Sequence, residues 1–327
     1  MSYTTQPCRV AGVLATLVMI GVSSAEPAAQ PGYPSRPIRL IVPFPAGGQT
    51  DIVARVLAQK LTETFRHPVV VDNRPGGGGT IGTEIGVRAT PDGYSLIIVS
   101  TSYAANAALY KLPYDPLNDV VPITLIGEIP NMVTVDPSGP AKSIKSLIAY
   151  AKANPGKLNY ASGGTGSGVH LATELFNQMA GTRMTHVPYK GAGAGVSDLL
   201  GGQIHLIFGG LPVMLPHVKA MRLRGIAITS AKRSEAVPDV PTVSETVPGY
   251  EAVSWAALLG PKALPTSVVS RWNSEIERIL QMSDVKERMK AHGLELIGGP
   301  PGRLRELLRR DVAKWHKVVI SAGIRAD

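Results

Sequence analysis

Short apolar runs alternate with helical patterns over the first hundred residues of the chain. Residues 38–43, 69–71 and 95–99 are apolar runs with the length and composition of buried strands. Between them, residues 51–65 and 84–89 carry apolar side chains at the spacing of one helical face. This alternation of strand and helix predicts an α/β fold with a mainly parallel sheet.

The same alternation restarts after residue 120 and predicts a second α/β unit. Its expected strands are residues 123–127, 132–135, 158–161, 185–189, 204–208 and 225–229, and its expected helices are 143–154, 169–180 and 196–200. Ser143 is the expected N-cap of the first of these helices. Residues 232–251 are rich in proline and charge and predict a long surface connection. A strand at 254–260 and helices at 267–281, 284–292 and 303–321 are expected after it.

Two glycine-rich loops, one in each unit, are the strongest candidates for a functional site. The first is PFPAGGQTD at residues 43–51, and the second is YASGGTGSG at residues 160–168. Each follows a strand and leads into a helix, so its backbone N–H groups, in the first loop those of residues 46–50, are expected to face an anion. Gly47 and Gly48 allow a close approach because they lack Cβ atoms. Neither loop holds a nucleophile beside a base, which favours binding over catalysis.

The N-terminal residues are typical of a secretory signal peptide, predicted over residues 1–25. Arg9 is the only charge before an apolar stretch at 10–22, and Ser23-Ser24-Ala25 resembles a cleavage site. Cleavage after Ala29 is an alternative. The apolar stretch is short for a membrane span of about 20 residues, which disfavours an uncleaved anchor. Export to the periplasm is therefore expected.

Composition removes several classes of function. Cys8 is the only cysteine and lies within the predicted signal peptide, so the mature chain is expected to lack disulfides, thiolate catalysis and cysteine metal sites. The formal net charge is +9, but the basic residues are scattered. The exception is residues 303–310, where they alternate with leucines in the pattern of a solvated helix face. With only 5% aromatic residues available for base stacking, no nucleic-acid partner is expected.

Two features near the first loop have competing interpretations. Asp51 either orients the loop or serves the helix N-terminus as a cap and a complement to the helix dipole, and the second interpretation is favoured. Gly77-x-Gly79-x-x-Gly82 matches a dinucleotide fingerprint, but residues 73–75 separate it from its strand. We therefore expect this glycine motif to form a turn packed beside the first loop, and we expect it to bind no cofactor.

The second loop has its own candidate side chains. His170 and Glu174 share a helix face, but the HExxH pattern is absent, so no metal is expected. His170 is expected either to donate to a ligand or to support the loop. Ser162, Thr165 and Ser167 offer hydroxyl groups without an adjacent base, and one of them is expected to cap the helix.

Longer motifs extend these observations along the whole mature chain. They read, in order, YPSRPIRLIVPFPAGGQTDIVAR, VVVDNRPGGGGTIG, PDGYSL, LPYDPLNDVVPIT, PGKLNYASGGTGSGVHLATELF, THVPYKGAG, LLGGQI, PDVPTVSE and WHKVVISAGI. In this order they resemble the substrate-binding proteins of tripartite tricarboxylate transporters, the Bug (Bordetella uptake gene) or TctC-like family.

The resemblance implies a fold and a function. It implies a two-lobed periplasmic binding protein of type II with a ligand cleft between the lobes, two crossover strands, and C-terminal helices folded back on the first lobe. The implied first lobe is residues 34–128 with 250–327, and the second is 129–249. A small carboxylate, a di- or tricarboxylate or an aromatic acid, would be captured by hinge closure. A monomeric protein would deliver it to the membrane permease subunits of the transporter.

The resemblance also implies contact residues on both lobes. Those expected on the first lobe are Phe44, Ala46, Gly47, Gly48, Thr50 and Asp51, with Asn73, Ser100 and Thr101 nearby. Those expected on the second lobe are Ser162, Gly164, Thr165, Gly166, Ser167 and His170, with Tyr189, Lys190 and Gly191 behind them. Lys190 either meets a carboxylate or is solvated.

The chain departs from the family pattern at a few positions. Gln49 stands where a small residue or proline is common, and His205 and Gly209 stand in a region where many members have an acidic residue. Without an acidic partner for an amino group, a plain carboxylate or an aromatic acid is expected rather than an amino acid. Two other functions stay open: a ligand-sensing module for a membrane kinase, and an exported serine hydrolase using Ser162 or Ser167 with His170.

Overall fold

The computed structural model describes residues 1–4, 32–189 and 192–325. Most of the predicted signal peptide, together with Lys190 and Gly191, lies outside the described residues. Within the described ranges, no helix combines the length and the apolar character that a membrane span needs.

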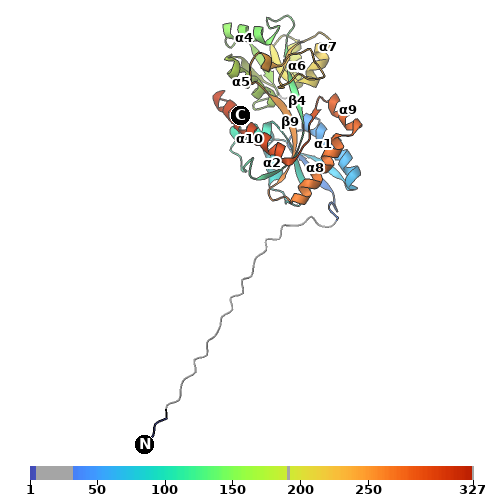
Figure 1. Ribbon diagram of the computed structural model, residues 1–327. Helices are drawn as coiled ribbons and strands as arrows, with labels where there is room; N and C mark the ends of the chain where they lie inside the picture. The colour runs from blue at the N-terminus through green and yellow to red at the C-terminus, as the bar shows by residue number, and fades with distance from the viewer. Residues whose placement is uncertain (5–31, 190–191, 326–327) are drawn as a thin grey trace.

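The first lobe is the lower part of the molecule in Figure 1 and is built around three parallel strands. Strand β1 pairs in parallel with β2 on one side and with β3 on the other. The apolar pattern does not predict α3, because its sequence SYAANAAL is mostly alanine and small polar residues. The elements are β1 (Ile38–Val42), α1 (Gln49–Phe65), β2 (Val69–Asn73), η1 (Gly77–Gly79), α2 (Thr80–Val87), β3 (Ser95–Ser100) and α3 (Ser102–Leu109).

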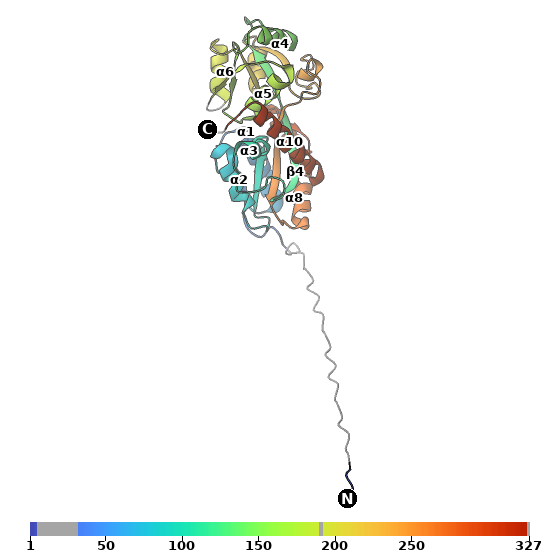
Figure 2. The same ribbon diagram turned by 90° about the vertical axis from the view of Figure 1, so that its left-hand side faces the viewer.

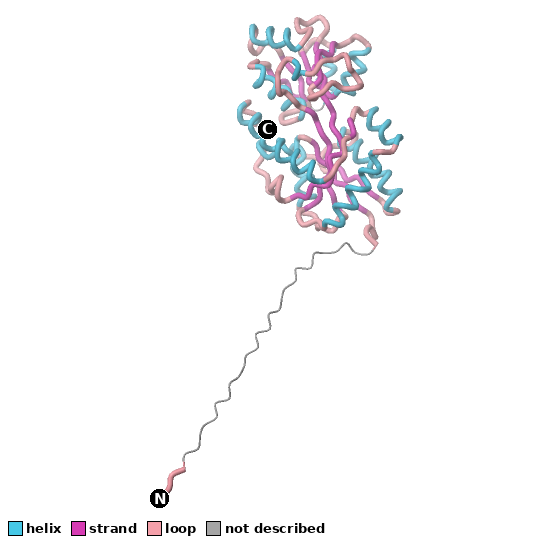
Figure 3. The backbone as a smooth tube through the Cα atoms, in the orientation of Figure 1, coloured by secondary structure: helices cyan, strands magenta, loops and turns pink. Residues whose placement is uncertain are grey.

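Two long strands cross from one lobe to the other. Strand β4 (Val120–Val135) pairs antiparallel with β9 (Val253–Pro261) along its first part and with β7 (Leu206–Gly210) and β8 (Arg224–Ile228) along its second. Figure 3 shows these strands running through the waist of the molecule. The α/β class is as predicted, but the sheet is mixed rather than mainly parallel, because the crossing strands run against their neighbours.

The second lobe, the upper part in Figure 1, repeats the parallel arrangement. Strand β5 pairs in parallel with β6 and β7. Ser143 is the N-cap of the first helix, as predicted, and its Oγ accepts the Ser146 amide at 3.2 Å. Helix α7 is not predicted, because Pro212 and Pro216 interrupt its pattern. The elements are α4 (Ile144–Ala153), β5 (Asn159–Ser162), α5 (Gly168–Ala180), β6 (Thr185–Pro188), α6 (Ala192–Leu200) and α7 (Leu211–Lys219).

The last helices return to the first lobe. Helices α8 (Thr266–Leu280) and α9 (Ser283–Ala291) pack against α1, and the short strand β10 (Glu295–Leu296) pairs with β4. Helix α10 (Pro301–Ser321) lies along β4 and touches both α3 and α5 (Figure 2). It therefore contacts both lobes on one side of the crossing strands.

The prediction that residues 232–251 lie on the surface is wrong for their second half. That half holds a single 3-10 turn, η2 (Val243–Glu245), yet Val243, Val247 and Tyr250 are buried. The Tyr250 hydroxyl donates to the Ala172 carbonyl of α5 at 2.9 Å. These three apolar residues recur at the spacing of one packed face. The prolines and charged residues around them obscure that pattern in the sequence.

Candidate functional site

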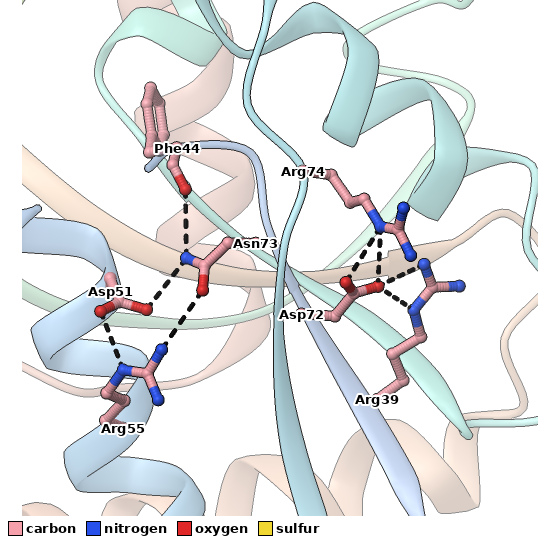
Figure 4. Close-up of polar contacts among 7 residues, drawn as sticks. All are labelled: Arg39, Phe44, Asp51, Arg55, Asp72, Asn73 and Arg74. Atoms are coloured by element: carbon pink, nitrogen blue, oxygen red, sulfur yellow. Dashed lines mark hydrogen bonds and ion pairs between the residues drawn. The ribbon is translucent and has the colours of Figure 1, made fainter. Parts of the chain in front are cut away.

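The first glycine-rich loop connects β1 to α1 and is organised by Asp51. The Gly47 N–H donates to Asp51 Oδ2 at 2.8 Å, and Asn73 Nδ2 donates to Oδ1 at 2.9 Å. Arg55 Nε also donates to Oδ2, at 2.9 Å (Figure 4). The N-cap of α1 is Gly48, without a side-chain cap, so the capping half of the favoured interpretation of Asp51 is wrong, whereas its place in the first turn fits the other half, a complement to the helix dipole. Asp51 also orients the loop.

The Asp51 carboxylate is buried and stays ionised. Burial alone would raise the pKa of Asp51, but the hydrogen bonds from Arg55, Gly47 and Asn73 outweigh burial and hold that pKa below its usual range. A negative charge in the first turn also complements the positive end of the α1 dipole.

Asn73 brings the end of β2 to the same loop. Its Nδ2 donates to the Phe44 carbonyl at 3.1 Å as well as to Asp51. A Cβ atom built on Gly79 would lie 3.3 Å from the Phe44 ring, so the glycine triplet forms a turn beside the first loop, as predicted. The structure thus brings together Phe44, Gly47, Asp51 and Asn73.

Ser100 and Thr101 stand at the end of β3 and serve the crossing strand. The buried Thr101 Oγ1 accepts the Trp255 backbone N–H of β9 at 3.0 Å. The Ser100 hydroxyl pairs with that of Ser102 at 3.1 Å. Thr101 therefore helps to fix β9 beside the first loop's sheet.

The second loop follows β5, and its backbone amides donate to the side chains of nearby residues. Ser162 Oγ accepts the Gly164 N–H at 3.1 Å and lies 2.6 Å from His186 Nε2. The Gly166 N–H donates to His170 Nδ1 at 3.1 Å. Ser167 caps α5 by accepting the His170 N–H at 3.4 Å, which confirms that one of the hydroxyls is a helix cap.

The stacked rings of His170, His186 and Tyr160 support this loop. The His170 and His186 rings lie 3.8 Å apart with 10° between their planes, and Tyr160 lies 5.1 Å from His186. Burial, and then the neighbouring His186, lower the pKa of His170 to about 3. A neutral imidazole leaves Nδ1 free to accept the Gly166 amide. Of the two roles predicted for His170, the structure shows support of the loop.

Sequence reasoning missed His186. It stands on β6, directly opposite Tyr160 in the parallel register, and Ser162 lies two residues further along the same face of β5. Pairing the two predicted strands in parallel would have placed all three side chains together. Tyr160 also donates to Glu174 Oε1 at 2.6 Å, which gives the helix carboxylate a structural partner.

The hydroxyls of this loop are not arranged as a hydrolase nucleophile. Ser162 is fully buried, its nearest imidazole is that of His186 rather than His170, and Ser167 is occupied at the helix N-terminus. Among the described residues, no three His, Cys, Asp or Glu side chains gather in a way that could hold a metal ion.

Other expected contact residues frame the second loop. The Tyr189 N–H donates to the Ser162 carbonyl at 3.1 Å, and its hydroxyl donates to Asp198 Oδ2 of α6 at 2.6 Å. Lys190 and Gly191, which follow directly, lie outside the described residues. Tyr189 therefore joins this loop to α6.

The second loop lies against the first lobe. A Cβ atom built on Gly166 would lie 2.4 Å from Leu109 Cδ1 at the end of α3, and one on Gly168 would lie 2.9 Å from Ser254 Oγ of β9. The second loop therefore stands beside α3 and the crossing strand β9. The first-turn N–H groups of α1 and α5 have no acceptor within their own helices, which makes each helix start an anion-attracting end.

A small cavity of about 60 Å³ lies elsewhere. It is lined by residues that include Val135, Asp136, Leu158 and His205. Leu158 precedes β5, whereas the second loop follows it, so this cavity opens at the opposite edge of the second lobe's sheet. It takes no part in the site formed by the loops.

Comparisons with known proteins agree with this architecture. The family model described as tripartite tricarboxylate transporter family receptor, TctC, matches residues 53–324. Protein BugT of Bordetella pertussis is 37% identical over 305 residues, which cover 92% of this chain and 94% of that protein. Rpa4515 of R. palustris, in a structure with adipate, has a TM-score of 0.79 and 36% identity, covering 90% of this chain and 100% of that one. MatC of Rhodopseudomonas palustris, with bound malate, has a TM-score of 0.76 and 30% identity, and the match covers 88% of this chain and 100% of that one.

Proposed function

The chain belongs to the TctC family of tripartite tricarboxylate transporter receptors, and from this premise we propose that it binds a small carboxylate between its lobes and delivers it to a membrane permease. Receptors of this family are periplasmic solute-binding proteins rather than enzymes. The predicted signal peptide over residues 1–25 supplies the export that this role requires.

The observation that carries the proposal is the pair of braced loops at two helix N-termini. Each loop is held by a buried side chain, Asp51 below the first and His170 below the second, and neither loop contains a basic residue. Desolvating a carboxylate is costly, and charge-assisted bonds from several fixed N–H and O–H donors offset that cost. Pre-positioned amides suit an anion that must later be released, because neither loop segment itself carries a fixed countercharge.

We propose that the lobes move about the crossing strands. In this division the first lobe is residues 34–128 with 250–327 and the second is 129–249. A ligand that bridges both loops binds the closed form better, and only this difference in affinity drives closure. The contact residues named above from both loops, with Tyr189, Lys190 and Gly191 behind the second, are the proposed lining.

The ligand class follows from relatives and from the chain itself. Adipate and malate, bound to Rpa4515 and MatC respectively, are both dicarboxylates. His205 lines the small cavity at the opposite edge of the sheet, so only Gly209, near the end of β7, bears on the ligand. The absence of an acidic side chain at Gly209 favours a plain or aromatic carboxylate over an amino acid. The first experiment is a thermal-shift panel of adipate, malate, citrate, benzoate, aspartate and glutamate on the signal-free protein. A true ligand at about 100 times its Kd adds roughly 2.7 kcal/mol to the free energy of unfolding.

A flat panel, on protein checked for ligand carried through purification, would contradict the proposed class. Tight calorimetric binding of aspartate or glutamate would contradict the preference against amino acids.

A substitution at Gly47 tests where the ligand lies. Gly47 has a φ of 78°, and a Cβ atom there would meet nothing within 4 Å, so the G47V side chain would enter the open space proposed for the ligand. Gly32 precedes β1 whereas the first loop follows that strand, and it has a φ of 98° and equally open surroundings, which makes G32V a matched control for backbone strain. Calorimetry should find at least a tenfold weaker Kd, about 1.4 kcal/mol, for G47V and an unchanged Kd for G32V. Equal affinities would remove Gly47 from the site.

A further inference from the structure

Arg55 contacts the side chains that hold the first loop, although it lies outside that loop. It stands on the second turn of α1 with its side chain 55% exposed. Its Nε donates to Asp51 Oδ2 at 2.9 Å, and its Nη2 donates to Asn73 Oδ1 at 3.3 Å. Figure 4 shows the guanidinium spanning these two side chains from the side away from Phe44.

The two partners of Arg55 hold the loop backbone at two points, one near its start and one in its middle. Asp51 accepts the Gly47 N–H, and Asn73 donates to the Phe44 carbonyl. The peptide groups of this segment therefore have their direction set by two side chains rather than by a helix or a sheet. Any ligand that reads the loop through its backbone depends on that direction.

From these contacts we propose that Arg55 is a positioning residue for ligand binding: it fixes Asp51 and Asn73 in the orientations that hold the first loop, without touching the ligand itself. The inference rests on the proposed function, because the loop is a binding element only if that function holds.

The fork of the guanidinium explains why an arginine is required. Asn73 Nδ2 already donates to Asp51 and to Phe44, so its Oδ1 is left to face a donor, and Arg55 supplies one. If the Asn73 amide turned over, its oxygen would face the Asp51 carboxylate, and two acceptors would be opposed. A lysine carries the same charge but lacks the planar fork that reaches both partners at once.

The other face of β2 offers a comparison within the same region. Arg74 Nε donates to Asp72 Oδ1 at 2.9 Å, and the Arg74 side chain is 52% exposed. Asp72 also pairs with Arg39. Figure 4 shows this group separated from Asp51 and Asn73 by the strand. Arg74 thus matches Arg55 in charge, exposure and partner type, but its side chain does not contact the partners of the first loop.

The test compares R55Q, R55K and R74Q in the signal-free protein. Hydrogen exchange of the ligand-free protein, followed by mass spectrometry, reports on residues 44–52, and calorimetry gives the affinity for adipate. We expect R55Q and R55K each to speed exchange in this segment and weaken adipate binding, both about tenfold. R74Q should leave both quantities at the wild-type value. Exchange elsewhere in α1 should stay unchanged, which separates loss of position from loss of fold.

Three outcomes would overturn the inference. If R55Q keeps both the wild-type exchange rate and the wild-type affinity, Arg55 does not fix Asp51 and Asn73. Full retention by R55K would assign the effect to charge rather than to the fork, and an equal loss in R74Q would assign it to the net charge of the region. If the wild-type protein does not bind adipate, the proposed ligand is wrong, and the exchange of residues 44–52 decides the role of Arg55 by itself.

Discussion

His170 supports the second loop only while it is neutral. Its Nδ1 accepts the Gly166 N–H at 3.1 Å, and its ring lies 3.8 Å from that of His186. Burial and His186 lower the pKa of His170 to about 3, whereas an unfolded histidine titrates near 6.5. Between these values the unfolded chain binds a proton that the folded chain does not. The contribution of His170 to stability is therefore fully present above about pH 6.5 and is lost as the pH falls towards 3.

The variant H170N removes this titration but keeps a side-chain oxygen near the position of Nδ1. As the pH falls from 7 to 4.5, the wild-type free energy of unfolding should drop by roughly 2 to 3 kcal/mol more than that of H170N, at about 1.4 kcal/mol per pH unit below 6.5. Urea unfolding at a series of pH values measures the difference. Parallel curves for the two proteins would show that His170 does not titrate as inferred.

At the scale of elements, the start of α5 is fitted to the end of α3. Gly166 has a φ of 75°, and a Cβ atom there would lie 2.4 Å from Leu109 Cδ1. Gly166 is thus required twice, for its backbone conformation and for the approach of a helix from the first lobe. The family resemblance places Gly166 in the ligand site, but it does not reveal this second constraint, because α3 is absent from the apolar pattern.

The variant G166A should destabilise the protein by about 1–2 kcal/mol for the left-handed backbone and further for the clash with Leu109. Shortening the neighbour in the double mutant G166A/L109A relieves the clash but not the backbone strain. The double mutant should therefore lose less stability than the sum of the two single mutants. Urea unfolding of the four proteins completes the cycle, and strictly additive losses would show that the two residues do not meet.

At the scale of the whole molecule, α10 braces the strands that join the lobes. The buried Asp311 accepts the Trp255 indole N–H of β9 at 2.7 Å, and Lys314 donates to the Glu251 carbonyl just before that strand. The buried core is continuous here, since Trp255 and Trp315 belong to one cluster with Phe176 and Phe208 of the second lobe. Any movement of the lobes must keep or exchange these contacts.

The variants W255F and W315F separate the indole hydrogen bond from packing. Both tryptophans are buried, but in the described part of the chain Trp315 Nε1 has no hydrogen-bond partner. Both changes remove similar volume, whereas W255F also leaves the buried Asp311 carboxylate without its indole donor. W255F should therefore cost about 1–3 kcal/mol more than W315F in urea unfolding. Equal losses would mean that the bond to Asp311 adds nothing to packing.

Much of the local order in both lobes follows from neighbours in the sequence. The predicted strand–loop–helix units at β1–α1 and β5–α5, the cap Ser143 and the solvated face of α10 are all present, and a second-loop hydroxyl, that of Ser167, caps its helix as one of three candidates. Each depends on residues within a few positions of one another, through helical spacing, glycine turns and capping side chains. The family resemblance, carried by the motifs in these same units, is confirmed by the family model and the relatives.

Contacts between distant segments had to come from the tertiary structure. Asp51 depends on Asn73, Ser162 on His186, and Gly166 on Leu109, and none of these pairs is set by local spacing. The crossing strand β4 reads as two short strands in the sequence because polar residues and a proline interrupt its apolar pattern, and only pairing with β9 and β7 makes it one. The sequence by itself determined the kinds of elements and the two loops, because local geometry depends on near neighbours. The tertiary structure decided which side chains hold those loops, because burial and partner choice depend on what the rest of the chain brings to them.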